Sequence, residues 1–275
     1  SAPATASALQ SCARRRLRLL WVPMVEFLQS FELAAHEWVL AGICGILIGM
    51  SKTGLAGLNM AVIPLFAMIF GARPSTGMLL PILIMADFYA VGYYTKHTNW
   101  HHVFRLMPWT LAGIGIAAIV GKLISGEVFT ILLAAIIIVG TILLIINELG
   151  KSKTVPNYWW FSGIMGTGGG FTTMIGNAAG PIMSLYMLSM RLPKNIFIGT
   201  GAWFFFIINV LKTPLHIFLW KTITLRTFLF DLLLLPAIAL GALLGIKIVK
   251  LIPDRWYRFL VIATTLAAAV LLFFR

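Results

Sequence analysis

GIMGTGGGFTTMIGNAAGP, residues 163–181, interrupts an apolar block that runs over residues 158–190. A second stretch, GMSKTGLAGLNMAVIP (residues 49–64), interrupts the block at residues 38–71 in the same way. Each block would form a helix of ~50 Å if it were continuous, which is too long for the ~30 Å hydrocarbon core of a bilayer. Each is also too short for two full spans and a turn. The spacing therefore predicts two half-helices that meet at a break inside a membrane, with Pro64 and Pro181 in the first turn of the restarting halves.

The composition supports a membrane protein. The 275 residues are 60% hydrophobic and only 11% charged, whereas a soluble domain usually needs about 25% charged residues to coat its surface. The net charge of +13 comes from Lys and Arg in short connectors between apolar blocks. A nucleic-acid-binding protein would instead gather these residues into one stripe, so this class is excluded. Cationic connectors are what anionic headgroups attract.

Most other apolar blocks have the length of one transmembrane span. They cover residues 74–94, 104–124, 128–146, 195–218, 227–249 and 256–274. One broken block followed by three spans therefore occurs twice, over residues 36–150 and 151–275. Pro64 matches Pro181 and Gly113 matches Gly241 in this register, which is the weak internal symmetry typical of transporters.

We predict an all-α polytopic membrane protein of two homologous repeats, each a Gly-broken helix pair plus three transmembrane helices. If the broken pair is a re-entrant hairpin, each repeat crosses three times and the repeats are inverted. If the pair crosses the membrane and each repeat has four spans, the repeats are parallel. We favour the inverted arrangement. Residues 1–35 are expected to form a tail with an amphipathic interfacial segment, because Pro23, Glu26 and Glu32 interrupt its apolar stretch.

The two breaks are suited to binding an anion. A helix that restarts presents unpaired N–H groups and a partial positive charge, and glycines let an oxyanion approach them closely. Asn59 and Asn177 lie near the expected N-caps of the restarting halves. The hydroxyl groups available at the breaks come from Ser51, Thr53, Thr172 and Thr173. The alternative is that the glycines serve only close helix packing and that the asparagines cap backbone.

Charged residues within apolar blocks carry further information, since a charge at mid-bilayer costs about 2.5–3.5 kcal/mol without a partner. Lys52 or Lys212 can attract an anion, and Asp87 can pair with a lysine or carry a coupling proton. A purely structural Lys–Asp pair is the alternative. Asp231 and Lys247 lie nearer the ends of their block, where snorkelling explains them.

The motifs that carry the clearest family signal are MSKTGLAGLNMAVIPL (50–65), LLPILIMAD (79–87), GGGFTTMIGNAAGPIMSLYMLS (168–189) and GTGAWFFFIINVLKTP (199–214). They resemble the TauE/SafE family of sulfite and organosulfur anion exporters, over about residues 38–274. The resemblance implies export of a sulfur-containing oxyanion, such as sulfite or a sulfonate, through the cell inner membrane. One departure is Leu58-Asn59-Met60, which stands where the family often has three glycines.

The resemblance also marks candidate binding residues, which stand in its motif positions: Lys52, Asn59, Thr173, Asn177, Asn209 and Lys212. The expected partners are this anion, membrane lipids and, as an option left open, a second copy of the chain. No cofactor is expected. The alternatives are a carrier for a carboxylate or a metal cation, an intramembrane enzyme, or a scaffold. Metal is suggested only by His97, His101 and His102, for which solvation at the interface is the favoured explanation. No enzyme motif is found, so we predict no catalytic residues.

Overall fold

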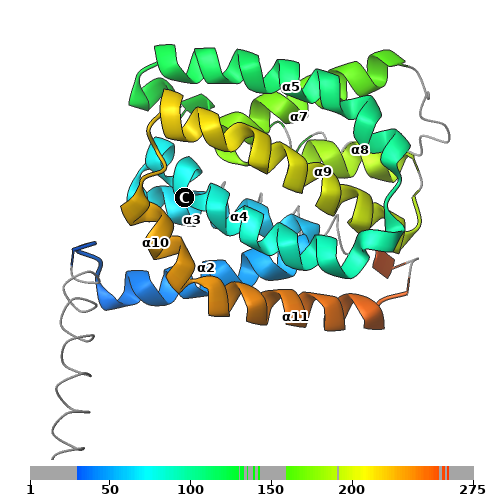
Figure 1. Cartoon of the computed structure of the whole chain (residues 1–275), viewed down its shortest axis with the longest axis horizontal. Helices are drawn as coiled ribbons and strands as arrows, with labels where there is room; N and C mark the ends of the chain where they lie inside the picture. Colours follow the sequence, from blue (N-terminus) through cyan, green and yellow to red (C-terminus); the bar gives the residue numbers. More distant parts are fainter. Residues whose placement is uncertain are drawn as a thin grey trace, which may run out of the picture. The chain divides into compact units, whose positions relative to one another are not determined.

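The computed structural model describes residues 30–129, 131, 132, 135, 139, 142, 159–190, 192–253, 256, 257 and 259. In these residues the chain forms helices and connections, and no strand (Figure 1). The predicted all-helical class is therefore confirmed. The principal helices are α2 (Ala35–Lys52), α3 (Asn59–Phe70), α4 (Ala72–Tyr94), α5 (Trp100–Leu123), α7 (Trp159–Gly176), α8 (Gly180–Ser189), α9 (Lys194–Pro214), α10 (Leu225–Leu233) and α11 (Leu235–Leu251).

Residues 1–40 form a unit of their own, and the residues from Ala41 onward form a second, larger one. In the first unit, α2 begins at Ala35, and the Glu37 carboxylate accepts a hydrogen bond of 2.8 Å from the Ala34 N–H. The Phe31 and Trp38 rings pack edge to face. The predicted interfacial segment lies almost wholly outside the described residues.

Three helices in the described part of the chain are long and apolar enough to cross a membrane: Ala72–His97, Trp100–Leu123 and Lys194–Leu219. The block at residues 227–249 is not the single straight span that the sequence predicts. It is divided into α10 and α11, which meet at an angle of 49°. Pro236 in the first turn of α11 provides the reason, because proline cannot donate a hydrogen bond to the preceding turn. The predicted spans at 128–146 and 256–274 lie largely outside the described residues.

Both long apolar blocks are broken, as the sequence predicts. α2 ends at Lys52, and a short 3₁₀ turn (Ala56–Leu58) precedes α3. α7 ends at Gly176, and α8 begins at Gly180. Pro181 lies in the first turn of α8, as predicted, but Pro64 lies inside α3. That prediction was wrong because α3 already begins at Asn59, at the end of the 3₁₀ turn.

Each broken pair folds back on itself. Phe161, near the start of α7, stacks on Tyr186, near the end of α8, with 5.8 Å between ring centroids. Phe70, at the end of α3, packs against Phe230 of α10, while Gly45 in α2 lies against the residues that follow α10. The two arms of each pair therefore begin and end at the same end of the helix bundle.

Glycines allow two pairs of helices to pack backbone against backbone. A Cβ added to Gly113 of α5 would lie 2.1 Å from the Thr167 carbonyl oxygen of α7. A Cβ on Gly241 of α11 would meet the Ile46 oxygen of α2 at the same distance. Figure 1 shows α5 beside α7 along one edge of the bundle and α2 beside α11 along the opposite edge. The glycines at 163–170 thus lie inside α7 and serve helix packing, the alternative considered from the sequence, while the break itself comes later, at residues 177–179.

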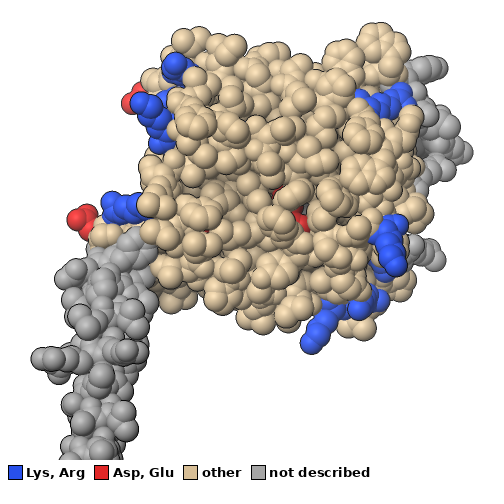
Figure 2. Space-filling view, viewed as in Figure 1, with Lys and Arg blue, Asp and Glu red and all other residues tan. Residues whose placement is uncertain are grey.

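The Lys and Arg side chains visible in Figure 2 lie near the two ends of the long helices. On the face in Figure 2, Lys and Arg occur at both ends, and the band between them lacks these residues. Arg73 at the start of α4 donates to the Gly121 and Ile124 carbonyls, at the end of α5. Lys194 at the start of α9 donates to the Val249 and Ile252 carbonyls at the opposite end. Such a band is what a hydrocarbon core requires. Asp231 is an exception to the sequence expectation, because it is fully buried instead of reaching an interface.

Candidate functional site

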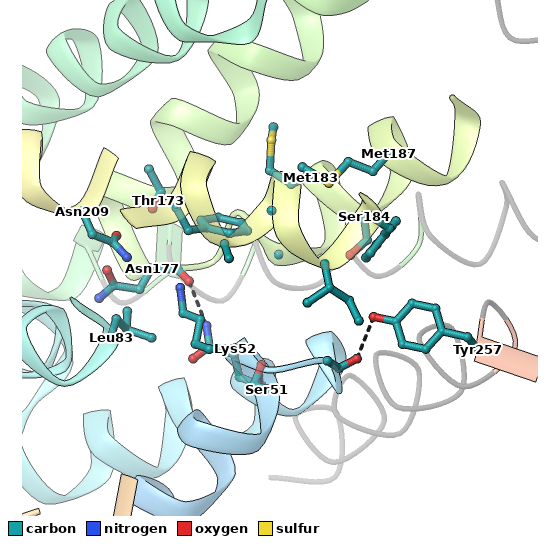
Figure 3. Close-up of a pocket in the computed structure, with 18 residues that line it drawn as sticks. Ser51, Lys52, Leu83, Thr173, Asn177, Met183, Ser184, Met187, Asn209 and Tyr257 are labelled. Atoms are coloured by element: carbon teal, nitrogen blue, oxygen red, sulfur yellow. Dashed lines mark hydrogen bonds between the residues drawn. The ribbon is translucent and has the colours of Figure 1, made fainter. Parts of the chain in front are cut away.

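A cavity lies between the two helix breaks, with polar groups gathered on one part of its wall (Figure 3). It contains about 70 Å³ of space open to the centre of a water molecule. Since roughly 10–15 Å³ of such space holds one water, the cavity has room for several waters or one small ion. Its polar lining residues are Ser51, Lys52, Asn59, Thr173, Asn177, Ser184, Asn209 and Tyr257.

Lys52, at the end of α2, forms an ion pair inside the protein. Its Nζ lies 2.9 Å from Oδ1 of Asp87 in α4, and the Asp87 carboxylate is fully buried. The other carboxylate oxygen accepts a hydrogen bond of 2.7 Å from the Asn209 amide of α9. The Lys52 ammonium also lies 4.6 Å from the centre of the Phe205 ring, a favourable cation–π distance. Lys52 is the member of the pair that lines the cavity, while Asp87 lies behind it.

Lys212 of α9 is fully buried behind the cavity wall. Its Nζ donates to the Thr173 carbonyl and the Thr173 hydroxyl, both at 2.9 Å, and to the Asn177 side-chain oxygen at 2.6 Å. Three acceptors match the three N–H groups of an ammonium. All of them are neutral, so the charge of Lys212 has no acidic partner among these contacts. Lys212 thereby ties the end of α7 to α9.

The two asparagines join the breaks to each other. Asn177 has a left-handed backbone (φ 56°), which asparagine tolerates better than most residues, and so it ends α7. Its side-chain amide donates to the Thr76 carbonyl of α4 at 2.9 Å. The Asn59 amide donates to the Asn177 carbonyl at 3.2 Å. Asn59 and Asn177 thus lie near the N-caps of the restarting helices, as predicted, while Leu58 and Ala179 occupy the N-cap positions themselves.

The starts of both restarting helices border the cavity. Gly180, the first residue of α8, lines it, and a Cβ added there would meet no atom within 4 Å. Asn59, the first residue of α3, lines it as well, although its backbone N–H already donates to the Ser51 hydroxyl at 3.2 Å. A helix start of this kind offers N–H groups and a partial positive charge to an anion.

Most of the residues predicted from the sequence lie together. The cavity is lined by Ser51, Lys52, Asn59, Thr173, Asn177 and Asn209. Asp87 and Lys212 lie immediately behind it and contact lining residues. Thr172 does not line it, because its side chain points back into α7 and donates to the Gly169 carbonyl at 3.2 Å.

Ser184, Phe205 and Tyr257 are among the lining residues that were not predicted. Ser184 lies four residues after Gly180 on the same face of α8, so helical periodicity offers a signal that could have found it. Phe205 lies one turn before Asn209 in α9, at the same spacing. Tyr257 comes from the far end of the chain, and nothing local in the sequence connects it with the first break.

The histidine connector does not gather around a common centre. His102 shares a hydrogen bond of 3.0 Å with the Tyr186 hydroxyl, and its ring packs against that of His101. Within the residues that the structure describes, no group of three or more His, Cys, Asp or Glu side chains has a geometry suited to a metal ion.

Long apolar helices, broken helices that fold back, and buried charges around a cavity are together features of membrane transporters. The chain belongs to the TauE/SafE family, since the family model described as "Sulfite exporter TauE/SafE" matches residues 41–272. Members of this family are transporters and not enzymes, so the protein is a multi-pass membrane transporter of the anion-exporting kind. No curated protein and no solved structure matches the chain.

Proposed function

We propose that the protein exports small sulfur-containing oxyanions, such as sulfite or a sulfonate, across the cell inner membrane, and that the anion binds in the cavity between the two breaks. The observation that carries this proposal is the charge around the cavity. Lys52 and Lys212 bring two positive charges, while Asp87 brings one negative charge. An unbalanced positive charge in a membrane protein is costly, and a bound monovalent anion would balance it.

The cavity wall offers donors suited to an oxyanion. Lys52 supplies an ammonium group, Ser51 and Thr173 supply hydroxyls, and the start of α8 at Gly180 supplies backbone N–H groups. Asn59 and Asn209 add amides that can exchange their present partners for the ligand. A carboxylate has the same hydrogen-bonding chemistry and is the main competing substrate class. A metal cation is less suited to a cavity with excess positive charge.

The inverted-repeat arrangement is part of this proposal. Each broken pair folds back at its own end of the bundle, and each packs through glycines on a helix of the other half, α7 on α5 and α2 on α11. Hairpins entering from opposite sides would bring their breaks to one shared site. Rocking of the halves about that site would expose it alternately to the two sides.

Lys52→Ala is expected to reduce uptake of radiolabelled sulfite into proteoliposomes by about 10-fold or more, because it removes a charge worth about 1.5–3 kcal/mol to a bound anion. The double variant Lys52→Ala/Asp87→Asn tests whether Lys52 acts on the anion or only neutralises Asp87. If Lys52 binds the anion, the double variant stays inactive. Lys122→Ala, at the exposed end of α5, is the control and should retain parental flux.

Recovery of flux in the double variant would show that Lys52 is a structural partner of Asp87 and would remove it from the site. Equal flux of sulfite, sulfoacetate and acetate would contradict the sulfur-oxyanion specificity. Measuring all three substrates with each variant in one preparation separates the role of Lys52 from the specificity for sulfur oxyanions.

Asp87 is proposed to couple transport to protons, since its carboxylate is buried beside the cavity and contacts both Lys52 and Asn209. We expect an imposed pH gradient to drive sulfite accumulation by the parental protein. Asp87→Asn should abolish this drive while leaving sulfite exchange across equal concentrations. Accumulation that ignores the gradient in the parental protein would refute the coupling.

A further inference from the structure

The wall of the cavity between the two helix breaks changes from polar to apolar along α8. The residues of this helix that line it are Gly180, Met183, Ser184 and Met187. Their spacing of three and four residues places them on one face of the helix. The lining thus begins with the N–H groups at the helix start and continues past two methionine side chains. At a rise of 1.5 Å per residue, Gly180 and Met187 are about 10 Å apart along the helix axis.

Helix α9 shows the same change in the opposite chain direction. Its polar lining residue is Asn209, and the lining residues before it are apolar: Phe197, Ile198, Gly201, Ala202 and Phe205. Together with Met183 and Met187 of α8, they form what we call the apolar part of the cavity. In Figure 3, Asn177 and Asn209 lie toward one end of the cavity, and the two methionines lie toward the other.

The apolar part has room for an additional group. A Cβ added to Gly201 would have the Met187 sulfur as its nearest neighbour, at 3.8 Å, which is an ordinary contact distance. A side chain at this position would therefore extend into the cavity without a clash. The polar groups nearby are few, since the Tyr257 hydroxyl already donates to the Gly54 carbonyl at 2.7 Å and Ser184 adds one hydroxyl. A molecule in this region meets mainly methyl, methylene and aromatic groups.

A small inorganic ion would leave this apolar surface unused. Sulfite has no carbon atom, so it can contact only the polar groups at the breaks. A substrate with a hydrocarbon group gains from the apolar part, because each CH₂ removed from water strengthens binding about 4-fold. The cavity is thus suited to a molecule with two unlike ends, an anionic group at the breaks and an apolar group between α8 and α9.

We propose that the cavity selects anions that carry a short apolar group, such as an alkanesulfonate, over sulfite, and that Met187 and Gly201 set the length of this group. The proposal rests on the proposed function for the anionic group and for its position at the breaks. It adds the chemical class of the rest of the substrate and two residues that determine specificity.

The apolar part is tested by calorimetric titration of the purified protein in detergent with sulfonates that differ only in their carbon chain. Propanesulfonate should bind about 10-fold more tightly than methanesulfonate, because two further CH₂ groups are buried. It should also bind about 10-fold more tightly than isethionate, which has the same length but carries a hydroxyl in place of the terminal methyl group. Equal affinity of propanesulfonate and either of the other two would overturn the proposal.

Two variants test the residues that set the length. Gly201→Leu fills the apolar part from α9 and should weaken propanesulfonate about 10-fold more than methanesulfonate. Met187→Ala enlarges it from α8 and should bind pentanesulfonate at least about 5-fold more tightly than the parental protein does. Gly115→Leu is the matched control, because this glycine is exposed on α5 and a Cβ there meets no atom within 4 Å. It should bind each ligand like the parental protein. An unchanged order of affinities in both cavity variants would overturn the role of these residues.

Acetate and butyrate separate this proposal from the proposed function, since they carry the same methyl and propyl groups on a carboxylate. If the preference for sulfur oxyanions is wrong, butyrate will bind as tightly as propanesulfonate, while the advantage of propyl over methyl remains. If the apolar part does not bind substrate, both sulfonates will bind more tightly than both carboxylates, and chain length will have no effect.

Discussion

Replacement of Lys212 by methionine is expected to reduce transport strongly and to lower the stability of the protein. Methionine is similar in length but donates no hydrogen bonds, so the Thr173 carbonyl, the Thr173 hydroxyl and the Asn177 side-chain oxygen lose their donor together. In water-soluble proteins, each buried polar group left without a hydrogen bond lowers the free energy of unfolding by about 1–3 kcal/mol. The values are smaller in membrane proteins, because polar groups also find partners in the unfolded state. We therefore expect a total loss of about 2–4 kcal/mol. Sulfite flux should fall on the order of 100-fold, since the wall of the site is displaced.

Thermal unfolding in detergent and flux in proteoliposomes measure the two effects. Lys247→Met is the matched control, because Lys247 lies in an apolar helix of comparable length but is exposed. We expect it to match the parental protein in both assays. A Lys212→Met protein with parental melting temperature and flux would contradict the role of Lys212 in joining α7 to α9.

Alanine at Gly113 is expected to destabilise the protein strongly, whereas alanine two residues later, at Gly115, should not. The added Cβ at Gly113 would lie 2.1 Å from the Thr167 carbonyl, so α5 and α7 must separate. Overpacking of this kind costs about 3 kcal/mol. At Gly115 no atom lies within 4 Å of the new Cβ, and alanine should stabilise the helix by about 0.5–1 kcal/mol.

The expected changes in melting temperature have opposite signs for the two variants. A single thermal unfolding series in detergent therefore tests whether α5 and α7 pack backbone against backbone. Equal melting temperatures for Gly113→Ala and Gly115→Ala would mean that α5 and α7 do not pack this closely. The Gly113→Ala variant should also lose transport, because α7 carries Thr173 and ends at the cavity.

The position of the breaks could be predicted only approximately. Both blocks are too long for one span, and this led correctly to interrupted helices. The glycine-rich stretch of the second block, residues 163–177, suggested a break, but residues 163–176 continue α7 and the helix is interrupted only at residues 177–179. Glycine permits both a break and a close helix contact, and only the presence of α5 against Gly166 and Gly170 decides between them.

The roles of the buried charges needed the tertiary structure. The sequence marked Lys52, Asp87 and Lys212 as costly within a bilayer, but it left open which lysine pairs with Asp87. The structure pairs Asp87 with Lys52 and gives Lys212 three neutral partners. Tyr257 could not be predicted at all, since its partner Gly54 lies 203 residues earlier in the chain.

By itself the sequence determined that this chain is a helical membrane protein with two interrupted helices, because hydropathy and backbone hydrogen bonding act over one or two helical turns. The tertiary structure alone decided which groups meet: the Lys52–Asp87 pair, the Asn59–Asn177 contact and the Tyr257–Gly54 hydrogen bond. These contacts join residues far apart in the chain, and their geometry depends on how closely whole helices pack, which no local pattern specifies.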